Sequence, residues 1–172
     1  MPICNVAEHR SRRLSPVQRR GEAKPIIWYL ELTDPGGIRP ARGSAPIERV
    51  DPPDGRVNRA FYEGIGADYA WTEHADETDA WWQAHAEAVE TWVIPGAGYA
   101  ELHAVGDDVE IAYFGLLPAH HGKGWGGALL EHALRRGFEL GSRVWVHTCS
   151  LDGPHALANY EARGLAVYRV EP

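Results

Sequence analysis

The sequence predicts an α/β domain in which helices flank a mixed sheet. Strand-like runs of β-branched, aromatic and aliphatic residues are interspersed with segments of helical periodicity, and one buried strand leads into a helix through a glycine-rich loop. Size agrees, because the roughly 147 residues after position 25 suffice for one domain with a sizeable core. We therefore expect residues 26–172 to form a single domain.

The expected strands are short runs that alternate apolar and polar residues or are apolar throughout. In chain order they cover 26–32, 47–51, 91–94, 97–103, 109–117, 144–149 and 165–170. The expected helices carry apolar residues on one face and start at a capping side chain or a turn. The first begins after Asp54 or Asn58, and the second begins at 76–79. The third begins directly after the glycine loop and ends at Gly141, and the fourth begins at 154 and ends at Gly164.

The stretch 110–130, EIAYFGLLPAHHGKGWGGALL, carries the clearest functional signal. Pro118 lacks a backbone donor and stops the strand. Four glycines then leave backbone N–H groups unshielded at the positive end of the next helix; they are Gly122, Gly124, Gly126 and Gly127. Such a loop is a cradle for an anion, usually a phosphate or pyrophosphate, and Lys123 adds a cation beside it.

Three kinds of glycine loop fit this region to different degrees. Gly122, Gly124 and Gly127 satisfy the dinucleotide pattern G-x-G-x-x-G, but the next strand, 143–149, ends in His-Thr-Cys instead of the acidic residue that binds ribose. A Walker loop is excluded because no Gly-Lys pair precedes Ser or Thr. The third pattern, Q/R-x-x-G-x-G/A, fits HGKGWG at 121–126, with His121 in the first position.

Residues on both sides of the loop extend this third pattern. The triplet LLP precedes it at 116–118, Glu110 stands six residues before the first leucine, and Tyr160 opens a Tyr-x-x-x-Gly-Leu motif about 35 residues beyond the loop. With these motifs in this order, the chain resembles the acetyltransferases of the GNAT superfamily. From 26 to 171 it is also similar to an uncharacterised bacterial subfamily that shares the phrases WYLE, EIAYFGLLP and VWVHTC. The resemblance implies a mixed, mostly antiparallel GNAT-type sheet with a splayed pair of parallel strands.

The resemblance also implies acetyl-CoA as the acyl donor, with its pyrophosphate on the loop amides and its pantetheine arm along the splayed strand. The residues expected to bind it are Leu116, Leu117, His121, Gly122, Lys123, Gly124, Trp125, Gly126, Gly127 and Asn159. Leu116 and Leu117 would act through their backbone, and the side chain of His121 is expected to be incidental. The family often has an asparagine where Gly153 stands, and Asn159 is the candidate substitute.

Direct acyl transfer needs a base for the amine and an acid for the departing thiolate. Glu110 is the candidate base, and Glu101 in a neighbouring strand is the alternative. The phenol of Tyr160 is the candidate acid, because its reference pKa near 10 lies just above that of a thiol. The competing interpretations are a solvent-facing glutamate and a core aromatic.

A cluster of His147, Cys149 and His155 near one strand end raises a His/Cys metal site or a cysteine nucleophile as a further hypothesis. These residues lack the spacing typical of metal ligands, so we predict no metal.

The function predicted from these residues is N-acetylation of a primary amine on a small molecule or peptide. The alternative is a catalytically inactive GNAT-fold module that binds acyl-CoA as a sensor or partner protein. The presence of both Glu110 and Tyr160 favours the enzyme. The segment 54–90 is expected to wall the acceptor side with aromatic residues: Tyr62, Tyr69, Trp71, Trp81 and Trp82.

Charge is distributed unevenly along the chain. Residues 1–25 hold six Lys/Arg against two Asp/Glu and predict a disordered basic tail, whereas the remainder holds 11 against 22. The acidic body argues against nucleic acid and for a cationic acceptor. Two cysteines and the lack of a long apolar run or signal sequence favour the cytoplasm and no membrane. A homodimer is compatible with the sequence.

Overall fold

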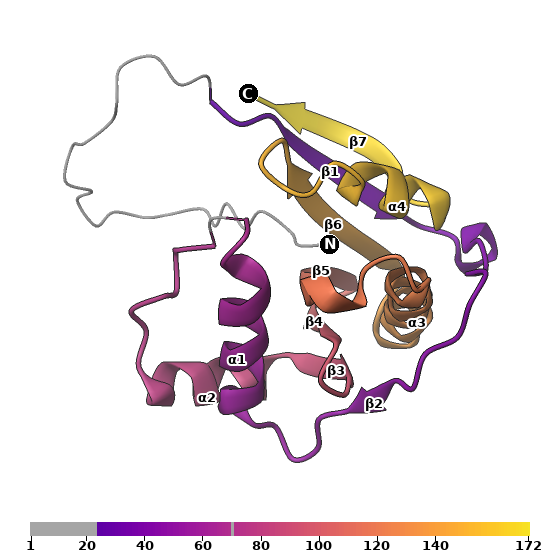
Figure 1. The fold of residues 1–172 in the computed structure, drawn as a ribbon. Helices are drawn as coiled ribbons and strands as arrows, with labels where there is room; N and C mark the ends of the chain where they lie inside the picture. The colour runs from indigo at the N-terminus through magenta and orange to yellow at the C-terminus, as the bar shows by residue number, and fades with distance from the viewer. Residues whose placement is uncertain (1–23, 70) are drawn as a thin grey trace.

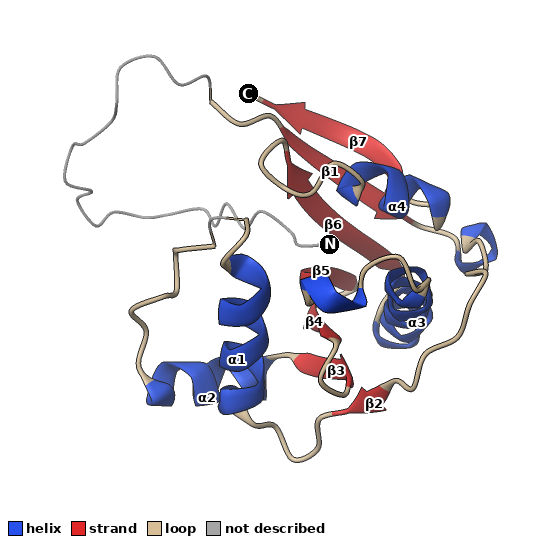
Figure 2. Cartoon of the chain, in the orientation of Figure 1, coloured by secondary structure: helices blue, strands red, loops and turns tan. Residues whose placement is uncertain are grey.

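The computed structural model describes residues 24–69 and 71–172, so most of the predicted basic tail lies outside the described residues. The described chain forms a seven-stranded sheet flanked by α-helices (Figures 1 and 2). The strands are β1 (Ile27–Leu32), β2 (Glu48–Arg49), β3 (Glu90–Ile94), β4 (Gly98–Val105), β5 (Asp108–Leu116), β6 (Arg143–Cys149) and β7 (Ala166–Glu171). The helices are α1 (Gly55–Gly66), α2 (Asp79–Ala88), α3 (Trp125–Leu140) and α4 (Ala156–Ala162), with 3-10 turns η1 (Pro35–Gly37) and η2 (Pro118–His120).

The first two helices each start after a polar residue whose side chain caps the helix N-terminus. The carboxylate of Asp54 accepts a hydrogen bond from the N–H of Arg56, so Asp54 is the cap of α1. Asn58, the other capping candidate, lies inside α1 and is fully buried, which corrects that alternative. Thr78 caps α2 by accepting from the N–H of Trp81 at 3.2 Å.

The strand order is β2-β3-β4-β5-β6-β1-β7, and β5 and β6 are its only parallel neighbours in the described chain. Parallel pairing joins Asp108–Glu110 to Arg143–Trp145 and then stops, although β5 continues to Leu116 and β6 to Cys149. The two strands therefore separate beyond Glu110. The predicted mixed sheet with a splayed parallel pair is confirmed.

A β-bulge in β5 lies next to this separation. Tyr113 pairs with Glu101 and Ile111 pairs with Leu102, so Ala112 is an extra residue on β5. As a result Ala112 and Tyr113 both belong to the aromatic cluster under α1 and α2. Because a β-bulge bends its strand, we expect β5 to bend just after Glu110, the last residue that pairs with β6.

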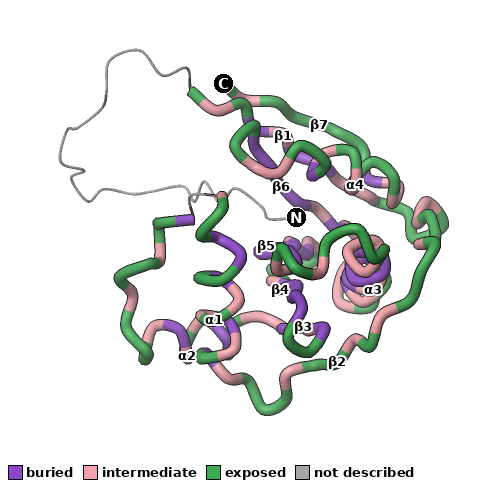
Figure 3. Tube along the Cα trace, viewed as in Figure 1, coloured by how far each residue is buried: buried purple, intermediate pink, exposed green. Residues whose placement is uncertain are grey.

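Two apolar clusters cover the two faces of the sheet. Figure 3 marks the buried positions along the chain in purple. The inner stripe of α3, which includes Leu130 and Leu134, packs with Tyr160 of α4 against one face of β4, β5 and β6. On the other face, α1 and α2 bring together Tyr62, Ile65, Trp71, Trp82, Tyr99, Ala112 and Tyr113. No helix among the described residues is both long and apolar enough to cross a membrane.

Candidate active site

Two cavities of similar size border β5. The first, here called the loop cavity, has a volume of about 490 Å³ and lies at the end of β5 beside the glycine loop. Its walls are Tyr69, Leu116, His121, Gly122, Gly124, Gly126, Gly127, Gly153, Pro154, His155 and Asn159. The second, the histidine cavity, has about 480 Å³ and is lined by Tyr29, His74, Trp81, His85, Ala88, Val89, His103, Glu110, Ala112, Tyr113, Trp145, His147 and Arg169. Each lies within the range of volumes usual for small-molecule sites.

The backbone of the loop cavity suits an anionic ligand. Gly122 and Gly124 have φ of 76° and 77°, in the left-handed region that favours glycine. Gly124 is the residue before α3, and none of the described side chains caps the first N–H groups of that helix. A Cβ at Gly126 would find Leu116 Cδ1 at 3.6 Å, an ordinary contact, so packing does not require glycine there. The absent side chain instead leaves the helix N-terminus open to a phosphate-bearing ligand.

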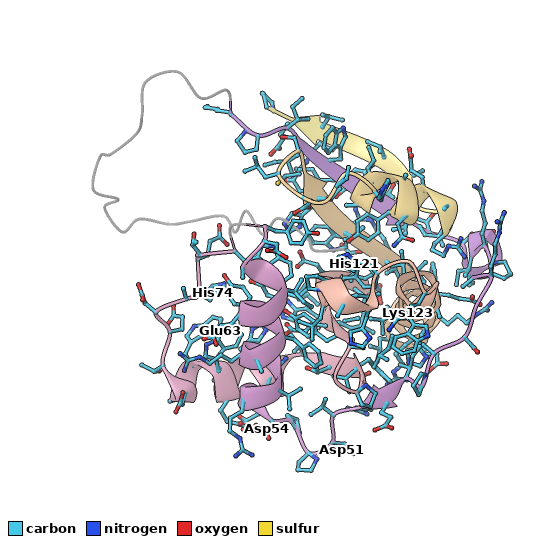
Figure 4. The ribbon with its side chains drawn as sticks, in the orientation of Figure 1. Asp51, Asp54, Glu63, His74, His121 and Lys123 are labelled. Carbon is cyan, nitrogen blue, oxygen red and sulfur yellow. The ribbon has the colours of Figure 1, made fainter. Side chains whose placement is uncertain are left out.

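Seven of the ten residues predicted to bind acetyl-CoA line this cavity: Leu116, His121, Gly122, Gly124, Gly126, Gly127 and Asn159. The other three, Leu117, Lys123 and Trp125, do not line it. Lys123, labelled in Figure 4, has its Nζ 3.4 Å from Nδ1 of His120 and 5.2 Å from the centroid of the Trp125 ring. The N–H of Leu117 donates to the carbonyl of Ala97 at 2.8 Å, so it bonds within the fold.

The His121 side chain has a structural contact that the sequence did not indicate. Its Nε2 lies 2.9 Å from the carbonyl oxygen of Leu116, which ties the loop to the end of β5. This contact is structural, and the expectation that the side chain is incidental to ligand binding stays a prediction. The bond also occupies one acceptor site of the Leu116 carbonyl on the strand expected to receive pantetheine.

Gly153 and Tyr69 form a further part of the loop cavity. A Cβ at Gly153 would lie 3.3 Å from the hydroxyl oxygen of Tyr69, closer than most such contacts. Glycine at this position therefore makes room for the tyrosine. Tyr69, expected at the acceptor side, lines the loop cavity instead, and the sequence offered no signal of its approach to Gly153.

Glu110 is one of the residues that line the histidine cavity. It is the last residue of β5 that pairs with β6, and its Oε1 lies 3.4 Å from Nδ1 of His147. The carboxylate therefore stands at the point where the two strands part.

Tyr160 lies on the opposite face of the sheet, in the cluster beneath α3. It is fully buried and its ring centroid is 6.0 Å from that of Phe114. Burial raises the pKa of Tyr160 well above its usual value, and its hydroxyl has no hydrogen-bond partner in the described residues. Tyr160 itself lines neither cavity, whereas its chain neighbour Asn159 lines the loop cavity and Glu110 lines the histidine cavity.

Glu101, the alternative base, is enclosed and does not line either cavity. Its two oxygens bond Asn58 Nδ2 at 2.7 Å and His85 Nε2 at 2.5 Å. Burial lowers the pKa of His85, but the hydrogen bond and negative charge of Glu101 outweigh burial and leave that pKa above its usual value. His85 was missed in the sequence, where its position four residues after Trp81 is only a helical spacing.

The three residues of the hypothetical metal cluster are dispersed. His147 lines the histidine cavity, His155 lines the loop cavity, and Cys149 is buried beside Ile27 and Tyr29. In the part of the chain that the structure describes, no group of three or more His, Cys, Asp or Glu side chains is placed to hold a metal ion.

Comparison with known proteins identifies the family. Residues 56–165 match the acetyltransferase (GNAT) family, which is more than half of the chain. The chain therefore belongs to the GNAT family, whose chemistry is acyl transfer. None of the curated proteins compared with the chain matches it.

Solved structures share the fold at low sequence identity. A GCN5-related N-acetyltransferase from Sphaerobacter thermophilus superposes with a TM-score of 0.60 at 18% identity, over 85% of this chain and 49% of that chain. One from Kribbella flavida gives a TM-score of 0.58 at 17% identity, over 84% and 55%. A GNAT acetyltransferase from Colwellia psychrerythraea gives 0.60 at 11% identity, over 85% and 54%. The chain thus spans about half the length of these structures.

Proposed function

We propose that the protein is an N-acetyltransferase that moves an acetyl group from acetyl-CoA directly to a primary amine. The observation that carries the proposal is the pair of cavities at β5: an anion cradle on one side, and a carboxylate-bearing aromatic cavity on the other. Family membership supports the general chemistry.

The donor side is supported by the geometry of the loop. The open backbone at Gly122 and Gly124 and the uncapped start of α3 would bind the pyrophosphate of acetyl-CoA. Asn159 and the end of β5 at Leu116 line the same cavity and would hold the pantetheine arm. When bound, acetyl-CoA supplies the thioester carbonyl that the amine attacks.

The acceptor side suits a cationic group. The carboxylate of Glu110 and the aromatic rings of Trp81 and Trp145 line the histidine cavity, and both kinds of group attract an ammonium ion. The ring of Tyr29, a further lining residue, already holds the guanidinium of Arg169 at 3.7 Å. Because an amine with a pKa near 10 is mostly protonated at neutral pH, Glu110 would take a proton and release the nucleophilic form. The acceptor is thus a primary amine small enough for a cavity of about 480 Å³, or one presented by a peptide side chain.

The acid is assigned to Tyr160. Its hydroxyl is buried and has no hydrogen-bond partner in the described residues, so it would be free to donate to the sulfur of the departing thiolate.

A screen of primary amines with free-thiol detection tests the function. With acetyl-CoA and a panel that includes benzylamine, an aliphatic diamine and a lysine-containing peptide, we expect amine-dependent thiol release and a matching acetylated product by mass spectrometry. Tight acetyl-CoA binding without turnover of any amine would instead favour the acyl-CoA-binding module.

A further inference from the structure

A buried carboxylate–imidazole pair supports the wall of the histidine cavity. Glu101 of β4 is 0% exposed, and both of its oxygens are in use: one accepts from Asn58 Nδ2, and the other lies 2.5 Å from His85 Nε2. The same Asn58 nitrogen donates to Thr91 Oγ1 at 2.7 Å, which holds the amide in place. A buried carboxylate is costly unless it is paired, and His85 is the cation-forming partner of Glu101.

The ring of His85 is held in one orientation. It stacks on Trp81 with centroids 5.2 Å apart and planes 5° from parallel. Trp82 and Tyr113 meet it edge-on at 5.8 Å and 6.1 Å. With Nε2 bound to Glu101, Nδ1 is the remaining ring nitrogen, and none of the described residues bonds it. The His85 side chain is 18% exposed and lines the histidine cavity.

We propose that His85 is a second proton acceptor for the amine, acting through Nδ1, and that Glu101 is its positioning residue. This inference rests on the proposed function of the same site. Glu101 fixes the proton on Nε2, which leaves the Nδ1 lone pair open to the cavity, and it stabilises the imidazolium that forms. Glu110 lines the same cavity, so the site holds two groups that accept protons.

The reaction needs two such transfers. An ammonium group loses two protons as it becomes an amide: one before attack, and one as the new C–N bond is completed and the C–S bond breaks. Glu110 takes the first and His85 takes the second. Tyr160 donates one proton to the departing sulfur. One of the two protons removed from the amine then replaces the proton lost by Tyr160, and the other passes to solvent.

The surroundings of His85 set its charge. Glu101 of β4 raises its pKa, whereas His74, which precedes α2, acts on it as a like charge when protonated. The other titratable and charged residues of the cavity lining are Tyr29 of β1, His103 of β4, Glu110 and Tyr113 of β5, His147 of β6 and Arg169 of β7.

Glu101→Gln tests the positioning role without removing volume. The amide oxygen can still accept from Asn58, but its NH₂ group would donate to His85 Nε2 and move the ring proton to Nδ1. The nitrogen that faces the cavity would then be a donor. In ¹⁵N-histidine spectra we expect the Nε2–H tautomer for wild-type His85 and the Nδ1–H tautomer in Glu101→Gln. The same tautomer in both proteins would overturn the assignment.

Kinetics with acetyl-CoA and benzylamine test the chemical role. His85→Gln keeps a donor for Glu101 but lacks an imidazole, and it should lower kcat by roughly 10²-fold with KM for benzylamine little changed. Glu101→Gln should do the same, and the acidic limb of the wild-type pH profile should be altered in both variants. His132→Gln, which replaces a half-buried histidine next to Trp92 on α3, is the matched control and should turn over normally.

The outcomes separate the two proposals. Unchanged kcat and an unchanged pH profile in both variants would overturn the role of His85 and leave the acetyltransferase intact. Absence of an acetyl-CoA thermal shift in the wild type would overturn the proposed function, and the inference with it.

Discussion

Gly126→Asp should separate stability from acetyl-CoA binding. Gly126 is the second residue of α3, and a Cβ there meets nothing closer than Leu116 Cδ1 at 3.6 Å. Replacing glycine in a helix gains a few tenths of a kcal/mol, and an acidic residue in the first turn adds about 0.3–1 kcal/mol. The melting temperature should therefore stay level or rise by about 1–4 °C.

Acetyl-CoA binding, in contrast to stability, should be lost in Gly126→Asp. Acetyl-CoA at about 100 times its Kd stabilises a protein by about 2.7 kcal/mol, or about 5–10 °C in a domain of this size. Gly126→Asp places a carboxylate in the cradle and should abolish this shift in a thermal melt. A wild-type response in the variant would refute the cradle, and a marked loss of basal stability would refute the open geometry at the start of α3.

Two further glycines calibrate the result. Gly124→Asp forces φ of 77° on a residue with a side chain and should cost about 1–2 kcal/mol as well as binding. Gly106→Asp is the matched control in the β4–β5 turn, with φ of 61° and nothing within 4 Å of a new Cβ. It should show the same loss of stability and an intact acetyl-CoA shift. Loss of binding in this control would mean that the assay reports general damage.

The remaining predictions concern protons and the tail. Tyr160→Phe should lower turnover by roughly 10²-fold or more while the acetyl-CoA shift persists, and unchanged kcat would exclude the phenol as the acid. Glu110→Gln should lower kcat/KM most at neutral pH and recover as the amine deprotonates; a loss equal at every pH would contradict a role as base. Because the folded pKa of His85 is raised, its stabilising effect is complete below the unfolded value near 6.5 and is lost as pH rises through the folded pKa. The difference in unfolding free energy between wild type and His85→Gln should therefore shrink with rising pH in urea titrations. Deletion of residues 1–24 should leave melting temperature and acetyl-CoA binding unchanged, and a large loss of either would show that the segment packs on the domain.

Local patterns located most elements to within a few residues. The run expected at 144–149 is β6, Arg143–Cys149, and the helix expected to end before Gly141 is α3, Trp125–Leu140. Both predictions worked because hydrophobic periodicity, glycine and proline act on the backbone over short distances. The capping of α1 was ambiguous for the same reason, since Asp54 and Asn58 are both good cap residues. Only packing decided that Asn58 is buried beside Thr91 and Glu101.

The order in which the strands pair in the sheet could not be predicted from such local patterns. β1 lies between β6 and β7, with Ile27 opposite both Cys149 and Glu171. The composition of the strand at 26–32 is compatible with many positions in a sheet. The position of β1 is set by which apolar faces close the core most completely, and that is a property of the whole fold.

The conformation of the glycine loop could be predicted from sequence alone because it depends on the backbone of neighbouring residues, 122–127. The sequence likewise named Glu110, Glu101 and Tyr160 as groups able to move protons. It could not determine which of them face a cavity, because that depends on the β5 bulge at Ala112 and on how α2 packs against β4. Tertiary packing buried Glu101 completely and left His85 lining the histidine cavity. It also put Glu110 and Tyr160 on opposite faces of the sheet. Burial and pairing determine the acid–base behaviour of each group, and both arise only when distant segments come together.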